Sequence, residues 1–265
     1  MIISDKEKFA FVHIPKCAGT SVRARIEHLD DRYGAYSSRL ENHSELGLLN
    51  YVHLPLATLA EHFSHDFECI QTYRSLAVLR DPSQRFISSV SQYCNRYTDT
   101  DMRSHSVKTL KREVWKLIDL LEGLEIKSPG SRLPAEFIHF QQQHHYTHLN
   151  GLQVVKHLVD VSQVDALLTS LLGHNVVMDE PSIKENESRV YRSPRARLLA
   201  LATRAVAPRL GAALPSVASK WVRAHVYSPL THQFDEVFQH EKVRSFIATY
   251  YEFDRHLSAN RICWG

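Results

Sequence analysis

The stretch Phe9–Ser21, FAFVHIPKCAGTS, decides the fold of this chain. It begins with the apolar run Phe9–Val12, which is long enough for a buried strand and too short for a free-standing helix. Pro15 ends the strand, and the segment Val22–Ile26 predicts a helix. A tight loop between a strand and a helix offers an anion both backbone N–H groups and the positive end of the helix dipole. The stretch therefore predicts an anion-binding loop.

The side chains of this loop strengthen the prediction. Lys16 adds a full positive charge, and Thr20 and Ser21 add hydroxyl donors. A Walker A loop has two glycines followed by a lysine and a hydroxyl residue, whereas here Lys16 precedes the single Gly19. The loop is therefore an anion site of another kind. The alternative is a plain strand, turn and helix with a surface lysine.

A second motif follows the buried strand predicted at Ser75–Leu79. The strand ends at Arg80, and Asp81 is a suitable N-cap for the helix that carries Ser88. A guanidinium group binds phosphate through two parallel hydrogen bonds, and a serine two turns along the helix points back to the same place. The motif predicts a second anion site. Alternatively, Arg80 only caps the strand edge and Arg85 pairs with Asp81.

Together the two motifs resemble those of sulfotransferases that use 3′-phosphoadenosine 5′-phosphosulfate (PAPS). The first is similar to the 5′-phosphosulfate loop of the carbohydrate (sulfotransferase family 2-like) branch, typically HIPKTAGTS, and departs from it only at Cys17. The resemblance implies that the 5′-phosphate is held by Pro15, Lys16, Cys17, Ala18, Gly19, Thr20 and Ser21. The second motif, LRDPSQRFISS, resembles the 3′-phosphate element, which assigns that role to Arg80 and Ser88. Asn186 and Ser188 match an Asn-x-Ser segment near the nucleotide.

The resemblance implies an enzyme that transfers a sulfuryl group from PAPS to a hydroxyl of a carbohydrate or glycoconjugate. Lys16 would neutralise charge on the leaving phosphate, and no metal is expected. His53 is the expected general base, because its segment partly matches a Gly-His-x-Pro element; Glu45 and His43 are the alternatives. Two rival classes stay open: a P-loop-type nucleotide-dependent kinase and a non-catalytic nucleotide-binding protein of the same fold.

Strands that alternate with helical stretches predict an α/β fold of the P-loop-like, three-layer type. We expect a central parallel sheet of about four or five strands flanked by helices, with ligands at the carboxyl ends of the strands. A further strand is predicted at 157–161, and 29–50 is predicted to be a loop. Helices are predicted at 56–63, 107–122, 135–148, 163–172 and 241–257. Without repeats or linkers, one domain over 1–265 is expected.

The composition excludes several other classes. The chain of 265 residues has a net charge of +3 and a pI near 8.6, which does not by itself argue for nucleic acid and suits an enzyme with anionic ligands. Its four cysteines are far apart, so neither a disulfide framework nor a zinc site is expected. The histidine pairs His144-His145 and His62-x-x-His65 have no matching second pair, so packing or solvated roles are favoured.

The location of the protein is also predicted from its sequence. The N-terminal segment is short and polar, with no visible signal peptide or membrane anchor, so a cytoplasmic, bacterial enzyme is expected. The arginine- and alanine-rich stretch 195–226 suits an amphipathic basic helix, which either faces solvent or makes a peripheral contact with a membrane or an acidic polymer. The sequence does not indicate the acceptor or the oligomeric state.

Overall fold

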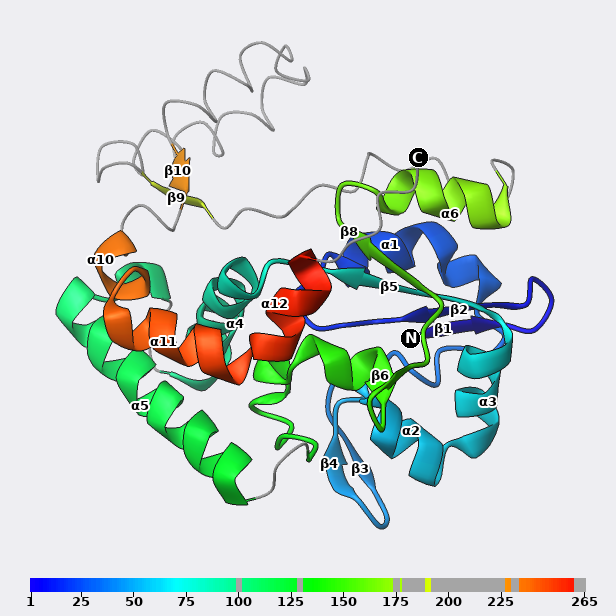
Figure 1. The fold of residues 1–265 in the computed structure, drawn as a ribbon, viewed down its shortest axis with the longest axis horizontal. Helices are drawn as coiled ribbons and strands as arrows, with labels where there is room; N and C mark the ends of the chain where they lie inside the picture. Colours follow the sequence, from blue (N-terminus) through cyan, green and yellow to red (C-terminus); the bar gives the residue numbers. More distant parts are fainter. Residues whose placement is uncertain are drawn as a thin grey trace, which may run out of the picture.

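The computed structural model describes residues 1–98, 102–127, 131–173, 177, 189–191, 227–229 and 234–259. A four-stranded sheet stands at its centre, in the order β1-β2-β5-β8 (Figure 1). The strands are β1 (Ile2–Ser4), β2 (Phe9–Val12), β5 (Arg74–Leu79) and β8 (His157–Asp160). β2, β5 and β8 run parallel, whereas β1 pairs antiparallel with β2. The predicted α/β fold is confirmed; β1 is an addition, in a segment predicted to be only a polar lead-in.

Helices cover both faces of this sheet. α1 (Gly19–Ile26) and α6 (Val164–Leu172) lie on one face, and α2 (Leu56–His62) and α3 (Ser64–Thr72) lie on the other (Figure 1). The strands and these helices share one hydrophobic core, in which every residue of β2 is buried. Burial on both faces explains why the parallel strands β2 and β5 are largely apolar without alternation. The segments that follow β2 and β5 leave the sheet at the same edge.

A second hydrophobic core lies beside the sheet, among helices from later in the chain. These are α4 (Pro82–Tyr97), α5 (Val107–Lys127), α10 (Asp235–Phe238), α11 (Glu241–Tyr250) and α12 (Glu252–Ala259) (Figure 1). α4 begins as predicted, because Asp81 Oδ1 accepts a hydrogen bond from the Gln84 N–H at 3.0 Å. Within the described ranges, no helix has both the length and the apolar character needed to cross a membrane.

Short elements connect these helices and strands. They are η1 (Glu27–Leu29), β3 (Glu41–His43), β4 (Gly47–Leu49), η2 (Tyr51–His53), η3 (Met102–Ser104), η4 (Ile138–Phe140), η5 (Gln143–Tyr146), β6 (His148–Leu149), β7 (Leu152–Gln153), β9 (Arg189–Tyr191) and β10 (Tyr227–Pro229). The prediction of an irregular loop at 29–50 was wrong in part, because β3 and β4 pair there as an antiparallel hairpin. The basic stretch 195–226 lies outside the described residues.

The helix predicted at 135–148 was also wrong. The structure has two 3₁₀ turns there, η4 and η5, separated by extended backbone at Gln141 and Gln142. Gln141 Oε1 accepts from the Leu133 N–H at 2.6 Å, and Gln142 Nε2 donates to the Tyr250 carbonyl at 2.9 Å. Because both glutamines are buried, these hydrogen bonds outweigh the helical periodicity of the segment.

A buried ion pair ties this segment to α4 and α12. The carboxylate of Asp254 accepts from the backbone N–H groups of Gln143 (2.7 Å) and His144 (2.9 Å), and it lies 3.9 Å from Arg85 Nη2. Arg85 in turn donates to the carbonyl of His139 at 3.2 Å. Burial alone would raise the pKa of Asp254, but the His144 hydrogen bond and the charge of Arg85 lower it below its usual value. The carboxylate is therefore ionised and fixes residues 139–144.

This arrangement predicts a large stability loss for Asp254→Asn. The substitution leaves the buried Arg85 charge uncompensated, so the free energy of unfolding should fall by about 3 to 5 kcal/mol. Urea denaturation of the purified protein measures it. The control is Asp119→Asn, which breaks the exposed pair with Lys242 and should cost less than about 1 kcal/mol. Equal losses in the two variants would mean that the buried pair is not a structural tie.

Candidate active site

The loop after β2 has a strained backbone. Lys16 and Ala18 both have left-handed conformations, with φ of 65° and 58°, which side chains other than glycine adopt rarely. Ala18 is the N-cap of α1, and its carbonyl accepts from the Ser21 N–H at 3.0 Å and the Val22 N–H at 3.2 Å. The earlier N–H groups of α1 have no acceptor within the helix and are available to an anion.

A close contact between His13 and Gly19 shapes this loop. A Cβ atom at position 19 would lie only 2.0 Å from Cδ2 of the His13 imidazole, so the buried ring occupies the space that glycine leaves open. The His13 ring also packs edge-on against the His53 ring, with 4.6 Å between the ring centres. Glycine is therefore required at position 19 by the packing of the histidine beneath it.

The two sequence motifs meet in one cavity of about 240 Å³. Its lining includes the predicted residues Lys16, Ala18, Gly19, Thr20, Ser21, Arg80, Ser88 and His53. Pro15 and Cys17 are buried and are not among the residues that line the cavity. The hydroxyl groups of Thr20, Ser21 and Ser88 make no hydrogen bond with any residue in the described part of the chain. The cavity thus presents free donors next to backbone N–H groups.

Arg80 connects the second motif to the loop. It follows the last residue of β5, and its Nη1 donates to the Lys16 carbonyl at 3.3 Å. Ser88 lies on α4, the helix that begins two residues later. Lys16 and Arg80, which are 64 positions apart in the sequence, therefore line the same cavity from two neighbouring strand ends.

The side-chain amide of Gln143 forms hydrogen bonds with both motifs, at Cys17 in the loop and at Arg80 after β5. Its Oε1 accepts from the Arg80 N–H at 3.0 Å and from Cys17 Sγ at 3.3 Å, and its Nε2 donates to the Arg80 carbonyl at 2.9 Å. Gln143 is fully buried, so these bonds do not compete with water. The amide thereby fixes the distance between the loop and the end of β5.

The cavity has a positive lining. Lys16, Arg39 and Arg80 contribute cations, and no aspartate or glutamate of the described ranges lies in the lining. Lys16 Nζ contacts only Gln92 Oε1, at 3.5 Å, among the described residues. Burial lowers the pKa of Lys16, and the nearby charges of Arg80 and Arg39 lower it further. A bound anion would reverse this effect and favour the charged lysine.

His53 contributes a different kind of group to the same cavity. Its Nδ1–H donates to the His13 carbonyl at 3.0 Å, and because a carbonyl can only accept, the proton must be on Nδ1. Nε2 of the neutral ring therefore keeps its lone pair. Burial, and then the nearby His139, lower the pKa of His53 well below its usual value. The imidazole is neutral at physiological pH and can accept a proton.

The alternative bases lie elsewhere. His43 and Glu45 are on the β3–β4 hairpin, outside the lining of the cavity. The His43 Nδ1 accepts from the Glu45 N–H at 3.2 Å, and the Glu45 side chain is exposed. Asn186 and Ser188 fall outside the described residues.

Comparison with known proteins identifies the family of the chain. A sequence model of the sulfotransferase family matches residues 1–257. The chain belongs to the sulfotransferase family. No curated protein and no solved structure was found to match the chain.

In this sulfotransferase, Cys17 replaces the threonine that the family resemblance leads one to expect. Its Sγ donates to Gln143 Oε1, and burial raises the pKa of the thiol to about 12. The thiol is therefore a hydrogen-bond donor inside the loop and not a nucleophile.

Three further lining residues of the sulfotransferase were not found from the sequence: Arg39, Gln92 and His139. Gln92 lies four residues after Ser88 on α4, so helical spacing could have indicated it. No functional motif marks Arg39 or His139, and only tertiary contacts bring them to the cavity.

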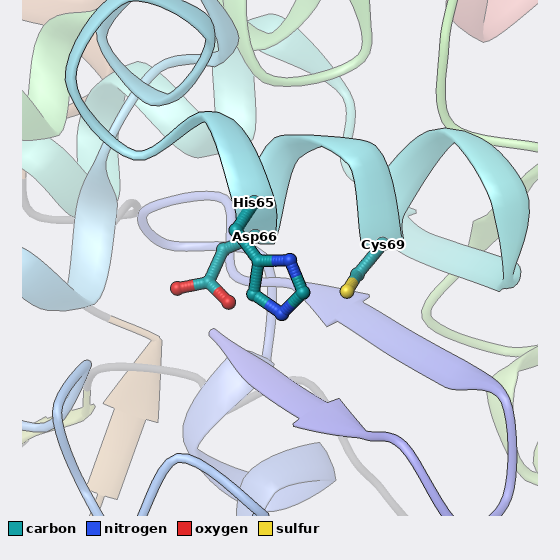
Figure 2. A group of neighbouring side chains, drawn as sticks. All are labelled: His65, Asp66 and Cys69. Atoms are coloured by element: carbon teal, nitrogen blue, oxygen red, sulfur yellow. The ribbon is translucent and has the colours of Figure 1, made fainter.

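A cluster on α3 has the composition of a metal site but a different role. His65, Asp66 and Cys69 place their ligand atoms within 4.8 Å of one another (Figure 2). However, the guanidinium of Arg32 donates to Asp66 at 2.5 Å and to Cys69 Sγ at 3.5 Å, and Tyr36 also donates to Asp66. Arg32 therefore already supplies the positive charge, and we interpret the cluster as structural.

The His13 contact predicts the effect of Gly19→Ala. The added methyl group must displace the buried His13 ring, which should cost about 1 to 3 kcal/mol of stability and distort the loop. Gly123, in α5, is the matched control because a Cβ there meets no atom within 4 Å. Gly123→Ala should stabilise the protein by about 0.5 to 1 kcal/mol. Thermal melts compare the two; a neutral Gly19→Ala would contradict the packing argument.

Proposed function

We propose that this sulfotransferase transfers a sulfuryl group from PAPS to a hydroxyl of a carbohydrate or glycoconjugate. The observation that carries the proposal is the single cavity in which the loop, Lys16, Arg80, Ser88 and His53 meet. The donor carries phosphate at both its 5′ and 3′ positions, so a pocket for it needs two anion sites. The loop with α1 offers one, and Arg80 with Ser88 offers the other.

When bound, the nucleotide supplies the sulfuryl group and a phosphate leaving group. Lys16 and the N–H groups at the start of α1 stabilise the charge that grows on the leaving oxygen, which is the main task in transfer of this kind. Arg80 and Ser88 hold the 3′-phosphate. Nε2 of His53 takes the proton of the acceptor hydroxyl, while its Nδ1–H stays on the His13 carbonyl.

The lining also bears on the rival functions. A kinase binds magnesium through carboxylates, and among the residues that the structure describes no aspartate or glutamate lines this cavity. A non-catalytic protein has no need of a neutral imidazole with a free Nε2 beside the cation sites. The direct test is transfer of radiolabelled sulfate from PAPS to a panel of sugars and glycans. Tighter binding of ATP than of PAPS, with no transfer, would favour a kinase.

Arg80→Ala tests the 3′-phosphate site. It should weaken binding of 3′-phosphoadenosine 5′-phosphate by about 2 to 4 kcal/mol, because a charged partner is lost. Binding of adenosine 5′-phosphate, which has no 3′-phosphate, should hardly change. Calorimetric titration measures both affinities. Arg74→Ala is the control, since Arg74 is exposed at the other end of β5 and donates to the Glu7 carbonyl. Equal losses for both nucleotides would make Arg80 structural.

His53→Ala tests the general base. Turnover should fall about a hundredfold or more while nucleotide binding is kept. Because the pKa of His53 is well below 6.5, the ring is neutral at pH 6.5 and above. Wild-type turnover should therefore be level at neutral pH and fall only in acid. Glu45→Gln and His43→Ala, both on the hairpin, are the matched variants and should retain turnover. Loss of activity in Glu45→Gln alone would make the glutamate the base.

A further inference from the structure

His139 is a second imidazole in the cavity, and the proposed mechanism does not use it. It belongs to η4 and lines the cavity next to His53, with 5.5 Å between the two ring centres and an interplanar angle of 73°. Its ring nitrogens form no hydrogen bond or ion pair with any residue in the described ranges. A largely buried imidazole with unsatisfied nitrogens at a cavity wall is available to a ligand.

The backbone of His139 is held in place. Its carbonyl accepts from Arg85 Nη1 at 3.2 Å and from Ser89 Oγ at 2.7 Å, and both side chains are buried on α4. These bonds belong to the same network that the Asp254 carboxylate anchors. The ring is therefore presented to the cavity by a rigid support, which is the usual arrangement of a binding residue.

The charge state of His139 indicates what it binds. Burial, followed by the charges of Lys16 and Arg96, lowers its pKa to about 3, so the ring is neutral. A neutral imidazole has one N–H donor and one lone pair, which matches a hydroxyl group, whereas an anion needs donors only. The lining thus contains two kinds of group: the cations Lys16, Arg80 and Arg39, and the neutral imidazoles of His53 and His139.

We propose that His139 binds a second hydroxyl of the acceptor, adjacent to the hydroxyl that receives the sulfuryl group. This inference rests on the proposed function and narrows the acceptor to compounds with neighbouring hydroxyls, as on a sugar ring. The two imidazoles are in edge-to-face contact, so the hydroxyls they bind must also be neighbours. His53 takes the reacting proton, because its Nδ1–H is fixed by a carbonyl, and His139 orients the ring.

The test is a double-mutant cycle in which one change is made in the protein and the other in the acceptor. Wild-type enzyme, His139→Phe and His139→Gln are assayed with PAPS and with p-nitrophenyl hexosides, together with the monodeoxy analogue of each sulfated hexoside. His139→Phe keeps an aromatic ring but cannot hydrogen-bond, so it should lower kcat/KM for the parent hexoside by about tenfold. With the analogue that lacks the neighbouring hydroxyl, His139→Phe should have nearly the same kcat/KM as the wild-type enzyme, because the hydrogen bond is already lost. His139→Gln, which both donates and accepts, should recover part of the loss.

A second measurement does not need turnover. The ¹⁵N-imidazole NMR signals of His139 are followed in protein saturated with 3′-phosphoadenosine 5′-phosphate while a methyl hexoside or its deoxy analogue is added. A chemical-shift change of the His139 signals with the parent sugar, and none with the analogue, supports the inference. Equal kinetic losses in His139→Phe with both acceptors, or no movement of the signals, overturns it while sulfate transfer stands. Absence of both transfer and nucleotide binding in the wild type overturns the proposed function, and this inference with it.

Discussion

The three hydrogen bonds of the Gln143 side-chain amide are the interaction on which the site depends. They join the backbone of Arg80, at the end of one strand, to Cys17, in the loop after the neighbouring strand. Parallel strands bring two anion-binding segments to one edge of a sheet, but they do not set the distance between them. Gln143 sets it, and Asp254 and Arg85 hold Gln143 and its neighbours against the helical layer. The second core thus supports the site through a few buried polar contacts.

The electrostatics of the cavity follow from this frame. Of the described residues that line it, Lys16, Arg39 and Arg80 are cations, three carry hydroxyl groups and none is a carboxylate, so these residues give the cavity a positive charge. Burial disfavours the charged form of Lys16, and an anionic ligand removes that penalty when it binds. The same burial keeps His53 and His139 neutral. The same buried cavity therefore holds two kinds of group: cations that suit a phosphorylated nucleotide, and neutral imidazoles that suit hydroxyl groups.

The parts of the site predictable from sequence are those whose chemistry is local. The strand, loop and helix from Phe9 onward form one continuous segment, and Arg80 and Ser88 belong to one short motif, so the residue order alone reveals them. Arg39 and His139 were missed because only the packing of distant segments brings them to the cavity. The helix predicted at 135–148 failed because buried glutamine hydrogen bonds, invisible in a periodicity, decide the backbone there.

A crystal structure of the protein with 3′-phosphoadenosine 5′-phosphate tests the central claim most directly. The account predicts that the 5′-phosphate lies against the loop and the start of α1, with Lys16 Nζ in contact. The 3′-phosphate should contact the Arg80 guanidinium and the Ser88 hydroxyl, and His53 Nε2 should face the 5′ end of the nucleotide. A nucleotide bound outside this cavity, or one whose 3′-phosphate does not contact Arg80, would contradict it.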